Sequence, residues 1–374
     1  MGIIIPLLII LFCGYVIWRA GDSFVEGSNY IGRNLSEGVK GATINAVASS
    51  MPELFIALFF LFYLKESSGF SGSLGTSLGS VIFNSLIIPS VAVYNVLLFS
   101  KKKFVSVSKK VILRDGLWLL AVEFLLIVII KDQVIDWFDG LLLIIIYCLY
   151  LFYIFRTMKN ADKIDYELTM SEKEKISFLS AFFVFDLRSM LIGNKKLNTS
   201  LAWFVFAFSS IVIGLVCYFL VIACDWLGSE SYTVPYLGSF SGLNTPILFI
   251  ALVFAAIGSS FPDTIISIKD AKDGNYDDAV SNAYGSNIFN LCIALGVPLF
   301  FYTSIYRTVI ELDGVVMDMI YQIWIWFVGL TIISIYTYYY GKGINKTRSI
   351  LMVASYFVFI AYVFFIATTT YASS

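Results

Sequence analysis

Long apolar runs alternate with short polar segments along the whole chain. Ten of these runs are at or near the length, about 20 residues, that an α-helix needs to cross the hydrocarbon layer of a membrane. To within a few residues at each edge, the runs are 3–18, 41–64, 74–99, 111–130, 137–155, 200–224, 244–268, 279–303, 315–340 and 349–370. The pattern predicts an all-α integral membrane protein with ten transmembrane helices.

A polar, charged segment separates the ten predicted helices into two sets of five. We interpret residues 158–197 as a cytoplasmic linker, which leaves no room for large regulatory domains. The apolar stretch Ile176–Phe185 inside it is too short to span a membrane, so we expect a short interfacial helix there. Residues 1–157 and 198–374 are then expected to be two five-helix repeats.

Lys and Arg residues are distributed unevenly between the predicted loops. Of the 25 Lys and Arg residues, only Lys65, Lys131 and Arg307 fall in even-numbered loops. By the positive-inside rule, the odd-numbered loops and the central linker are cytoplasmic, and both termini are extracellular. Because each half has an odd number of helices, the second half enters the membrane from the opposite side. This predicts the inverted-repeat architecture of many secondary transporters.

Two motifs occur once in each half of the chain. Ala46–Glu53 matches Ala256–Asp263 position for position, and Gly79–Asn84 matches Gly285–Asn290. Each copy of the first motif has a proline followed by an acid near the middle of an apolar run. Proline cannot donate a helical backbone hydrogen bond, so it frees carbonyl oxygens. An acidic side chain within a membrane usually marks an ion or substrate path.

Helical spacing places the polar residues of each motif on one face of its helix. Besides the acids Glu53 and Asp263, the polar candidates are Ser49, Ser50, Ser80, Asn84, Ser259, Ser260, Ser286 and Asn290. Four helices can thus direct carboxylate, amide, hydroxyl and backbone oxygens at one point. Such a cluster suits hard cations: Ca²⁺ accepts six to eight oxygen ligands, and the same oxygens can be divided among several Na⁺ ions.

Composition narrows the function classes further. The 374 residues are 59% hydrophobic and 14% charged, whereas ordinary soluble domains are about 25% charged. The net charge of −1 argues against nucleic-acid binding, and the lack of histidine excludes imidazole catalysis and histidine metal sites. The five cysteines have no metal-site spacing and are expected to be small buried side chains. We therefore expect neither an enzyme nor a cofactor.

At these motifs the chain resembles a known family. Ser49–Glu53 and Ser259–Asp263, with Gly-Ser-x-Ile-Phe-Asn at 79–84 and 285–290, are similar to the paired alpha repeats of the cation/calcium exchanger superfamily, particularly its sodium/calcium exchangers. The resemblance implies a secondary antiporter that exchanges Na⁺ for Ca²⁺ by alternating access. It also implies central ion ligands at Glu53 and Asp263. The further ion-site residues that it implies are Ser49, Ser50, Ser77, Ser80, Asn84, Ser259, Ser260, Ser286 and Asn290, with the carbonyls of Ala46 and Ala256.

Departures from the family pattern leave the coupling ion open. Ala48 stands where a Gly or small polar residue is usual, and Val81 replaces a common Asn. The Gly-Asn-x-x-Glu pattern of proton-coupled members is absent, and potassium-dependent members tend to have Asp where Asn290 stands. A proton- or potassium-dependent exchanger is the alternative. A cation channel is less favoured, and an intramembrane aspartyl protease would need a Gly-x-Gly-Asp motif that the chain lacks.

The expected partners are Ca²⁺, Na⁺ and membrane lipids, with no nucleic acid. We expect a multi-pass protein of the plasma membrane. The oligomeric state stays open, and a monomer is compatible with the pattern.

Overall fold

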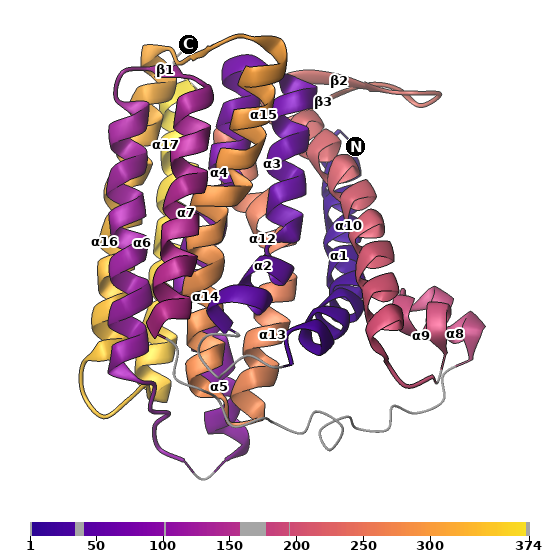
Figure 1. Cartoon of the computed structure of the whole chain (residues 1–374). Helices are drawn as coiled ribbons and strands as arrows, with labels where there is room; N and C mark the ends of the chain where they lie inside the picture. Colours follow the sequence, from indigo (N-terminus) through magenta and orange to yellow (C-terminus); the bar gives the residue numbers. More distant parts are fainter. Residues whose placement is uncertain (1, 34–40, 101, 158–176, 194, 372–374) are drawn as a thin grey trace.

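The computed structural model describes residues 2–33, 41–100, 102–157, 177–193 and 195–371 (Figure 1). Most of the predicted linker, residues 158–176, therefore lies outside the described residues. So do Lys40 and Lys101, two of the basic residues behind the topology prediction. The described part is mostly helical.

Each apolar run predicted in the first half lies in one helix or in consecutive helices. The elements are α1 (Ile4–Ile31), η1 (Gly41–Asn45, a π-helix), α2 (Ala46–Ser49), α3 (Met51–Leu64), α4 (Glu66–Leu86), α5 (Ile88–Phe99), α6 (Lys109–Ile130), β1 (Val134–Ile135) and α7 (Trp137–Thr157).

The second half has the same kind of organisation after two short connecting helices. Its elements are α8 (Phe178–Phe183), α9 (Leu187–Ile192), α10 (Thr199–Gly228), β2 (Ser231–Val234), β3 (Gly238–Ser241), α11 (Ile247–Ile250), the π-helix η3 (Ala251–Ala255), α12 (Ala256–Ser259), α13 (Phe261–Lys272), α14 (Tyr276–Phe289), the π-helix η4 (Asn290–Ala294), α15 (Gly296–Tyr306), β4 (Ile310–Glu311), α16 (Gly314–Tyr339) and α17 (Lys346–Tyr371).

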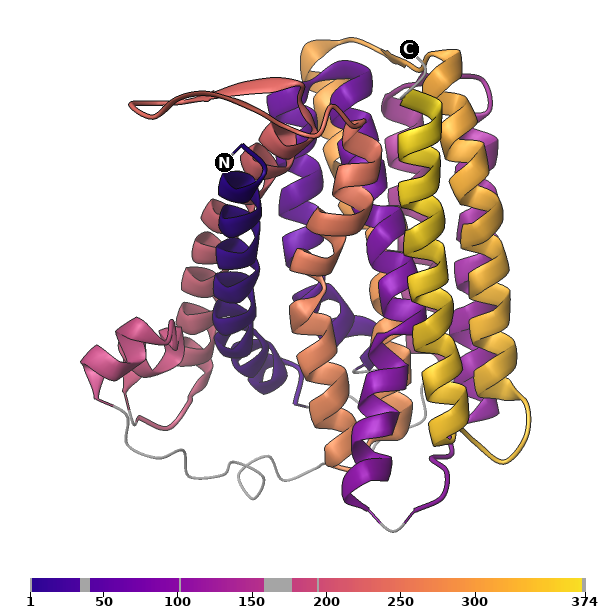
Figure 2. The ribbon, with the colours of Figure 1, turned by 180° about the vertical axis from the view of Figure 1, so that it is seen from behind.

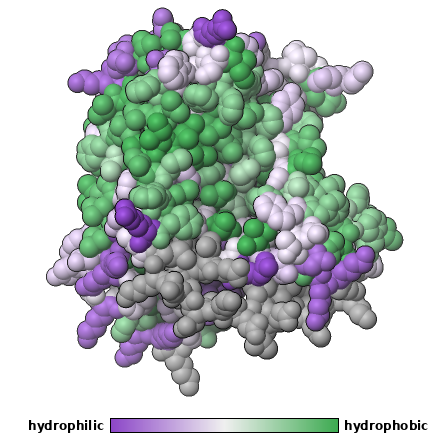
Figure 3. Space-filling model, in the orientation of Figure 1, coloured by the Kyte–Doolittle hydropathy of each residue, from purple (hydrophilic) through white to green (hydrophobic). Residues whose placement is uncertain are grey.

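Helix length and composition indicate a multi-pass membrane protein. Among the described residues, seven helical segments can cross a membrane singly, and two bent pairs raise the number to nine. Helix α6 has 22 residues but carries Arg114, Asp115 and Glu123 within its apolar stretch, so it has too many charged residues to count among these candidates. On the face shown in Figure 3, a broad apolar band covers the middle of the molecule, and polar residues gather toward its two ends.

The helices form three groups side by side. Helices α6, α7, α16 and α17 lie on one side, and α1 and α10 lie on the other (Figures 1 and 2). Between them lie α2, α3, α4, α12, α13 and α14, which carry the duplicated motifs. From the centre, α3 extends toward the end where α1 begins, and α13 extends toward the opposite end. The two motif copies therefore meet in the middle of the structure.

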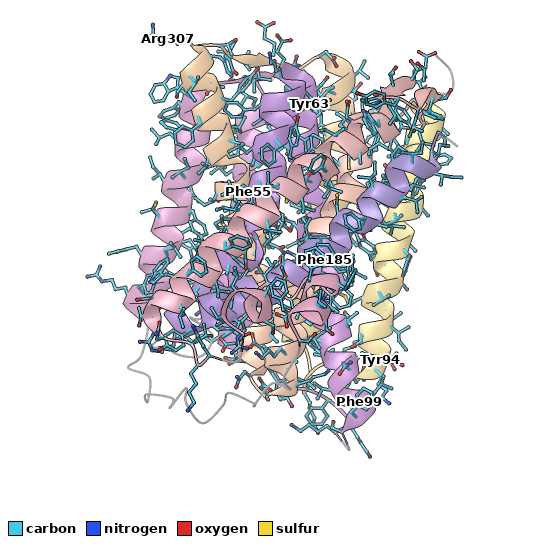
Figure 4. The ribbon with its side chains drawn as sticks, turned by 90° about the vertical axis from the view of Figure 1, so that its right-hand side faces the viewer. Phe55, Tyr63, Tyr94, Phe99, Phe185 and Arg307 are labelled. Carbon is cyan, nitrogen blue, oxygen red and sulfur yellow. The ribbon has the colours of Figure 1, made fainter. Side chains whose placement is uncertain are left out.

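Small strands and loops mark the two ends of the molecule. Antiparallel β2 and β3 form a hairpin that projects beyond the helices, and β1 pairs with β4 at the same end (Figure 2). Tyr63 and Arg307 lie toward this end, whereas Tyr94 and Phe99 lie at the opposite end (Figure 4). Phe55, two residues after Glu53, lies between these levels. The first acid of the duplicated motif is thus far from both ends.

The first helix is longer than its apolar run predicted. Its second half is polar in sequence but is buried by protein. In this half, Ser23 Oγ accepts a hydrogen bond from the backbone N–H of Arg188 at 3.0 Å. Arg188 Nε also lies 2.8 Å from Glu26 Oε1, an ion pair without hydrogen-bond alignment. These contacts let α1 continue to Ile31, well beyond the predicted end.

The stretch expected to form an interfacial helix contains α8, and a second short helix, α9, follows it. Asp186 accepts a hydrogen bond from the Ser189 backbone N–H at 3.1 Å, so it caps a new helix, α9, after α8 has ended. Exposed side chains of α8 include Phe178, Leu179 and Phe183. The cysteine prediction also needs one correction: Cys148 is exposed on α7, while the other four are buried.

Glycines allow the motif helices to approach closely. A Cβ atom on Gly79 of α4 would overlap the carbonyl oxygen of Leu252 and lie 2.6 Å from the Cβ of Ala256. A Cβ atom on Gly285 of α14 would lie 2.8 Å from the Cα of Ala42. Small residues at such contacts are typical of helix packing in membranes. Each second-motif helix thus packs directly against the first-motif segment of the other half.

Candidate ion-binding site

Each copy of the first motif is a bent pair of helices. The axis turns by 46° between α2 and α3, and by 43° between α12 and α13. Ser50 and Ser260 occupy the two bends, where their backbone ψ angles of 9° and 6° leave helical geometry. Pro52 and Pro262 follow as second residues of α3 and α13, where the missing N–H is tolerated. The predicted interruption is therefore present in both halves.

A π-helical turn precedes each bend. The π-helices η1 and η3 end one residue before Ala46 and Ala256, the first residues of the two motifs. Single π-helical turns occur frequently at functional sites in other proteins. Sequence reasoning missed these turns, because both lie inside continuous apolar runs, 41–64 and 244–268, that predict a single helix.

The carboxyl group of Glu53 lies in the interior between both halves. Its side chain is fully buried. Its Oε1 accepts hydrogen bonds from Ser80 Oγ on α4 and from Ser260 Oγ in the second motif, each at 3.3 Å. Among the described residues, no hydrogen-bond donor reaches Oε2. One oxygen is thus held by hydroxyl groups while the other remains available to a cation.

The carboxyl group of Asp263 has an equivalent environment. It is fully buried, and its Oδ1 accepts a hydrogen bond from Ser286 Oγ on α14 at 2.6 Å. Its Oδ2 accepts a hydrogen bond from Asn84 Nδ2 on α4 at 3.1 Å. Each acid is therefore bound by a serine of its own half and by a side chain from the other half.

Pairs of serines connect the two halves directly. Ser49 Oγ lies 3.4 Å from Ser286 Oγ, and Ser80 Oγ lies 3.3 Å from Ser259 Oγ. These four residues occupy matching motif positions, so the same contact is made twice. The structure thus brings eight of the predicted site residues into two hydrogen-bonded sets of four: Glu53 with Ser80, Ser259 and Ser260, and Asp263 with Ser49, Asn84 and Ser286.

The remaining predicted side chains are buried but make no hydrogen bond within the described part of the chain. Ser50 Oγ, Ser77 Oγ and both polar atoms of the Asn290 side chain are in this class, and so is Asn84 Oδ1. A buried polar atom that lacks a partner costs about 1–3 kcal/mol. Such oxygens beside two acids suit a hard cation, which takes oxygen ligands. The donor set therefore fits Ca²⁺ or Na⁺ as a transported substrate.

Neutral oxygens would have to supply most of the ligands. The described residues contain no group of three or more Cys, Asp and Glu side chains that could hold a metal ion. Glu53 and Asp263 form no ion pair with Lys or Arg in that part of the chain. Burying two unpaired carboxylates is prohibitively costly, so the pair requires neutralisation by ions or protons.

The two predicted carbonyl ligands are engaged in hydrogen bonds. The Ala46 oxygen accepts bonds from the Ser50 backbone at 3.1 Å and from Ser49 Oγ at 3.4 Å. The Ala256 oxygen accepts bonds from the Ser260 backbone at 3.1 Å and from Ser259 Oγ at 3.0 Å. The carbonyls that Pro52 and Pro262 leave without a helical donor are those of Ala48 and Gly258, four residues earlier, and not these two. The role of the Ala46 and Ala256 oxygens as ligands stays a prediction.

Asn282 is a polar neighbour of the site that sequence reasoning missed. Its Nδ2 lies 3.4 Å from the backbone oxygen of Asp263 and 3.2 Å from Ser267 Oγ, and its Oδ1 accepts a bond from Ser49 Oγ at 3.5 Å. It lies four residues before Ser286, hence on the same helix face, and that spacing was the available signal.

Comparisons with known proteins identify the family. The family model described as "Sodium/calcium exchanger protein" matches residues 5–156 and 201–365. The chain is 25% identical over 366 residues to human sodium/potassium/calcium exchanger 5, covering 81% of this chain and 71% of that protein. It is 31% identical over 160 residues to a probable sodium/potassium/calcium exchanger of Drosophila melanogaster, covering 42% of this chain and only 23% of that relative.

Solved structures share the fold. The sodium-calcium exchanger NCX_Mj, soaked with Na⁺ and Sr²⁺, matches with a TM-score of 0.57 and 20% identity, over 96% of this chain and 98% of its own. The H⁺/Ca²⁺ exchanger CAX matches with a TM-score of 0.61 and 12% identity, over 98% of this chain and 85% of its own.

Proposed function

The chain belongs to the sodium/calcium exchanger protein family, and we propose that it exchanges Na⁺ for Ca²⁺ across the plasma membrane by alternating access. The family consists of membrane transporters and not of enzymes. One observation carries the proposal. Glu53 and Asp263 are fully buried acids without a cationic partner among the described residues, and each is hydrogen-bonded by side chains of both halves.

The ions themselves make exchange obligatory in this proposal. Without a cation, the site holds two carboxylates in a medium of low dielectric constant, and the cost discourages passage between outward and inward states. One Ca²⁺ neutralises the pair, and so do enough Na⁺ ions. Each passage then requires a loaded site, so inward movement of one ion is tied to outward movement of the other. With three Na⁺ per Ca²⁺, one charge crosses per cycle, worth about 2.3 kcal/mol per 100 mV.

The membrane topology is part of the proposal. We propose that α6 is the tenth span beside the nine apolar candidates, and that residues 1–157 and 198–374 are inverted repeats joined by a cytoplasmic linker at 158–197. The opposite directions of α3 and α13 support inversion (Figure 1). Only Lys65, Lys131 and Arg307 of the 25 Lys and Arg residues fall in even-numbered loops, and this uneven distribution supports extracellular termini.

Potassium coupling is the second candidate. It is favoured by the names of the two relatives above, both sodium/potassium/calcium exchangers. Asn290 argues against it, because the potassium-dependent pattern places an acid at that position. Proton coupling has weaker support from the fold shared with the H⁺/Ca²⁺ exchanger at 12% identity.

The test is ⁴⁵Ca²⁺ uptake by proteoliposomes under imposed ion gradients. An outward Na⁺ gradient should drive saturable uptake without K⁺, and a pH gradient alone should not. Uptake that required K⁺ would replace the proposal by potassium coupling, and uptake with no cation on the opposite side would indicate a channel.

Variants test the assignment of the acids. Glu53→Gln and Asp263→Asn should each abolish exchange while the protein still inserts and purifies normally. Asp225→Asn is the matched control, because Asp225 lies near the end of α10, and among the described residues no hydrogen bond joins its carboxylate to a motif residue. Full exchange by the first two variants would show that the ions bind elsewhere.

A further inference from the structure

A third buried acid lies outside the candidate ion site. Glu123 of α6 is fully buried, and its Oε1 accepts a hydrogen bond from Thr331 Oγ1 of α16 at 2.6 Å. Its backbone oxygen accepts a bond from Trp324 Nε1 at 3.2 Å. Among the described residues, no donor reaches Oε2. The exchange proposed above gives this acid no role.

No positive charge in the described part of the chain neutralises Glu123. The nearest basic residues along its helix are Lys131, the exposed C-cap residue eight positions later, and Arg114, nine positions earlier, about 12 and 14 Å away along the axis. Arg114 is held by Asp115, with contacts of 2.6 and 2.8 Å. The buried titratable side chains on the main elements packed against α6 are Tyr147 and Tyr150 of α7, Asp278 and Tyr284 of α14, Cys292 of η4 and Tyr338 of α16. None of them is a cation.

The surroundings of Glu123 suit a proton better than a metal ion. A bare carboxylate inside a membrane protein is too costly to persist. Metal cations need several oxygen ligands, and the hydroxyl of Thr331 is the one side-chain group that hydrogen-bonds to the Glu123 carboxyl group in the described structure. A proton needs only Oε2. We propose that Glu123 is a proton-binding site, and that its protonation state controls the rate of exchange through α16.

Helix α16 connects this acid to the helices of the ion site. Thr331 lies one turn before Ser334, whose hydroxyl shares a hydrogen bond of 2.8 Å with Tyr284 of α14 and donates to the Ser85 carbonyl of α4 at 3.0 Å. Tyr284 precedes Ser286 by two residues, and Ser85 directly follows Asn84. Loss of the proton from Glu123 adds a charge at the contact of α6 with α16, and the disturbance reaches α4 and α14.

The sign of the effect follows from this arrangement. The packing described here accommodates the neutral carboxyl group, so deprotonation should disfavour it and slow the exchange cycle. The maximal rate should therefore fall as pH rises, by up to about tenfold per pH unit for a single proton. Protons that compete with Ca²⁺ at Glu53 and Asp263 act differently, because saturating Ca²⁺ overcomes them.

The first experiment measures the maximal Na⁺-driven ⁴⁵Ca²⁺ uptake in proteoliposomes against pH, at saturating Na⁺ and Ca²⁺. It rests on the proposed function. Glu123→Gln mimics the neutral acid and should remove the fall in rate at high pH. Thr331→Val keeps the acid and should keep the fall. A wild-type rate that does not change with pH, or the same fall in Glu123→Gln, would overturn the control of rate by Glu123.

The second experiment needs no transport. Infrared difference spectra of the purified protein should show a protonated carboxyl C=O band that Glu123→Gln removes. The band should persist in the double variant Glu53→Gln/Asp263→Asn. If wild type and Glu123→Gln have the same carboxyl band, Glu123 holds no proton. Because this result does not depend on exchange, failure of the proton site is distinguishable from failure of the proposed function.

Discussion

Replacing Gly79 by alanine should disable exchange by forcing the two motif segments apart. The added Cβ would overlap the Leu252 carbonyl oxygen of η3 and lie 2.6 Å from the Cβ of Ala256. Carbon atoms pack at about 3.5–4.0 Å, so the backbones must separate by about 1 Å. Ser80, adjacent to Gly79, contacts both Glu53 and Ser259, and the shift therefore reaches the ion site directly.

The expected magnitude follows from the cost of overpacking. Forcing extra atoms into a packed interior costs about 1–3 kcal/mol. If that energy is lost from ion binding, Ca²⁺ affinity falls about 5- to 150-fold, at 1.4 kcal/mol per tenfold. Gly285→Ala should have a smaller effect, because its Cβ would meet its closest neighbours in η1 and α2 at 2.8–3.1 Å.

The assay is Na⁺-driven ⁴⁵Ca²⁺ uptake against Ca²⁺ concentration, with thermal unfolding measured on the same preparations. Gly329→Ala is the control, because a Cβ on Gly329 of α16 meets no atom within 4 Å. Wild-type affinity in Gly79→Ala, or an equal loss in Gly329→Ala, would refute the reasoning from close packing.

Two further predictions concern other buried polar groups. If the Ser77 hydroxyl, which has no hydrogen-bond partner among the described residues, is an ion ligand, Ser77→Ala should raise the Ca²⁺ concentration for half-maximal uptake by about tenfold, equivalent to about 1.4 kcal/mol. The Ser209 hydroxyl on α10 is likewise buried without a partner there, and Ser209→Ala should leave that concentration unchanged. Glu26→Gln and Arg188→Leu should each lower the free energy of unfolding by about 3 kcal/mol, because each removes the oppositely charged partner of a side chain that is mostly buried. The double variant should be closer to wild type in thermal unfolding, and additive losses would contradict the pairing.

The meeting of the two motifs was predictable because it depends on local rules. Proline inside a long apolar run, as at positions 52 and 262, interrupts the helix or starts a new one, and an acid one residue later needs neutralising partners within the membrane. Spacing of three and four residues then assigned Ser49, Ser50, Ser259 and Ser260 to the faces of the acids. Eight of the expected side chains accordingly form two hydrogen-bonded clusters of four, one around each acid, and each cluster has side chains from both halves.

Differences between matching residues were not predictable. Asn84 and Asn290 occupy the same motif position, yet Asn84 donates to Asp263, and Asn290 makes no hydrogen bond within the described residues. Asn84 lies in the regular helix α4, whereas Asn290 begins the π-helix η4. An extra residue in a turn rotates the side chains that it carries. That turn depends on packing across the molecule, which a motif of six residues does not encode.

The two predicted carbonyl ligands illustrate a second limit. The resemblance implies the carbonyls of Ala46 and Ala256 as ligands, but it does not show which donors within the protein already bind them. Ser49 and Ser259 lie three residues after Ala46 and Ala256, and their hydroxyl groups turn back onto those carbonyls. Such local side-chain bonds compete with ion binding for the same oxygen atoms.

The unequal asparagines have a consequence for directionality. A carrier made of two identical halves would work equally well from either face of the membrane. Here the Asn84 amide is committed to Asp263, while its counterpart Asn290 is uncommitted. In the proposed carrier the inward and outward states are therefore not mirror images. Ca²⁺ should bind with different affinities from the two sides of the membrane, so that exchange is favoured in one direction over the other.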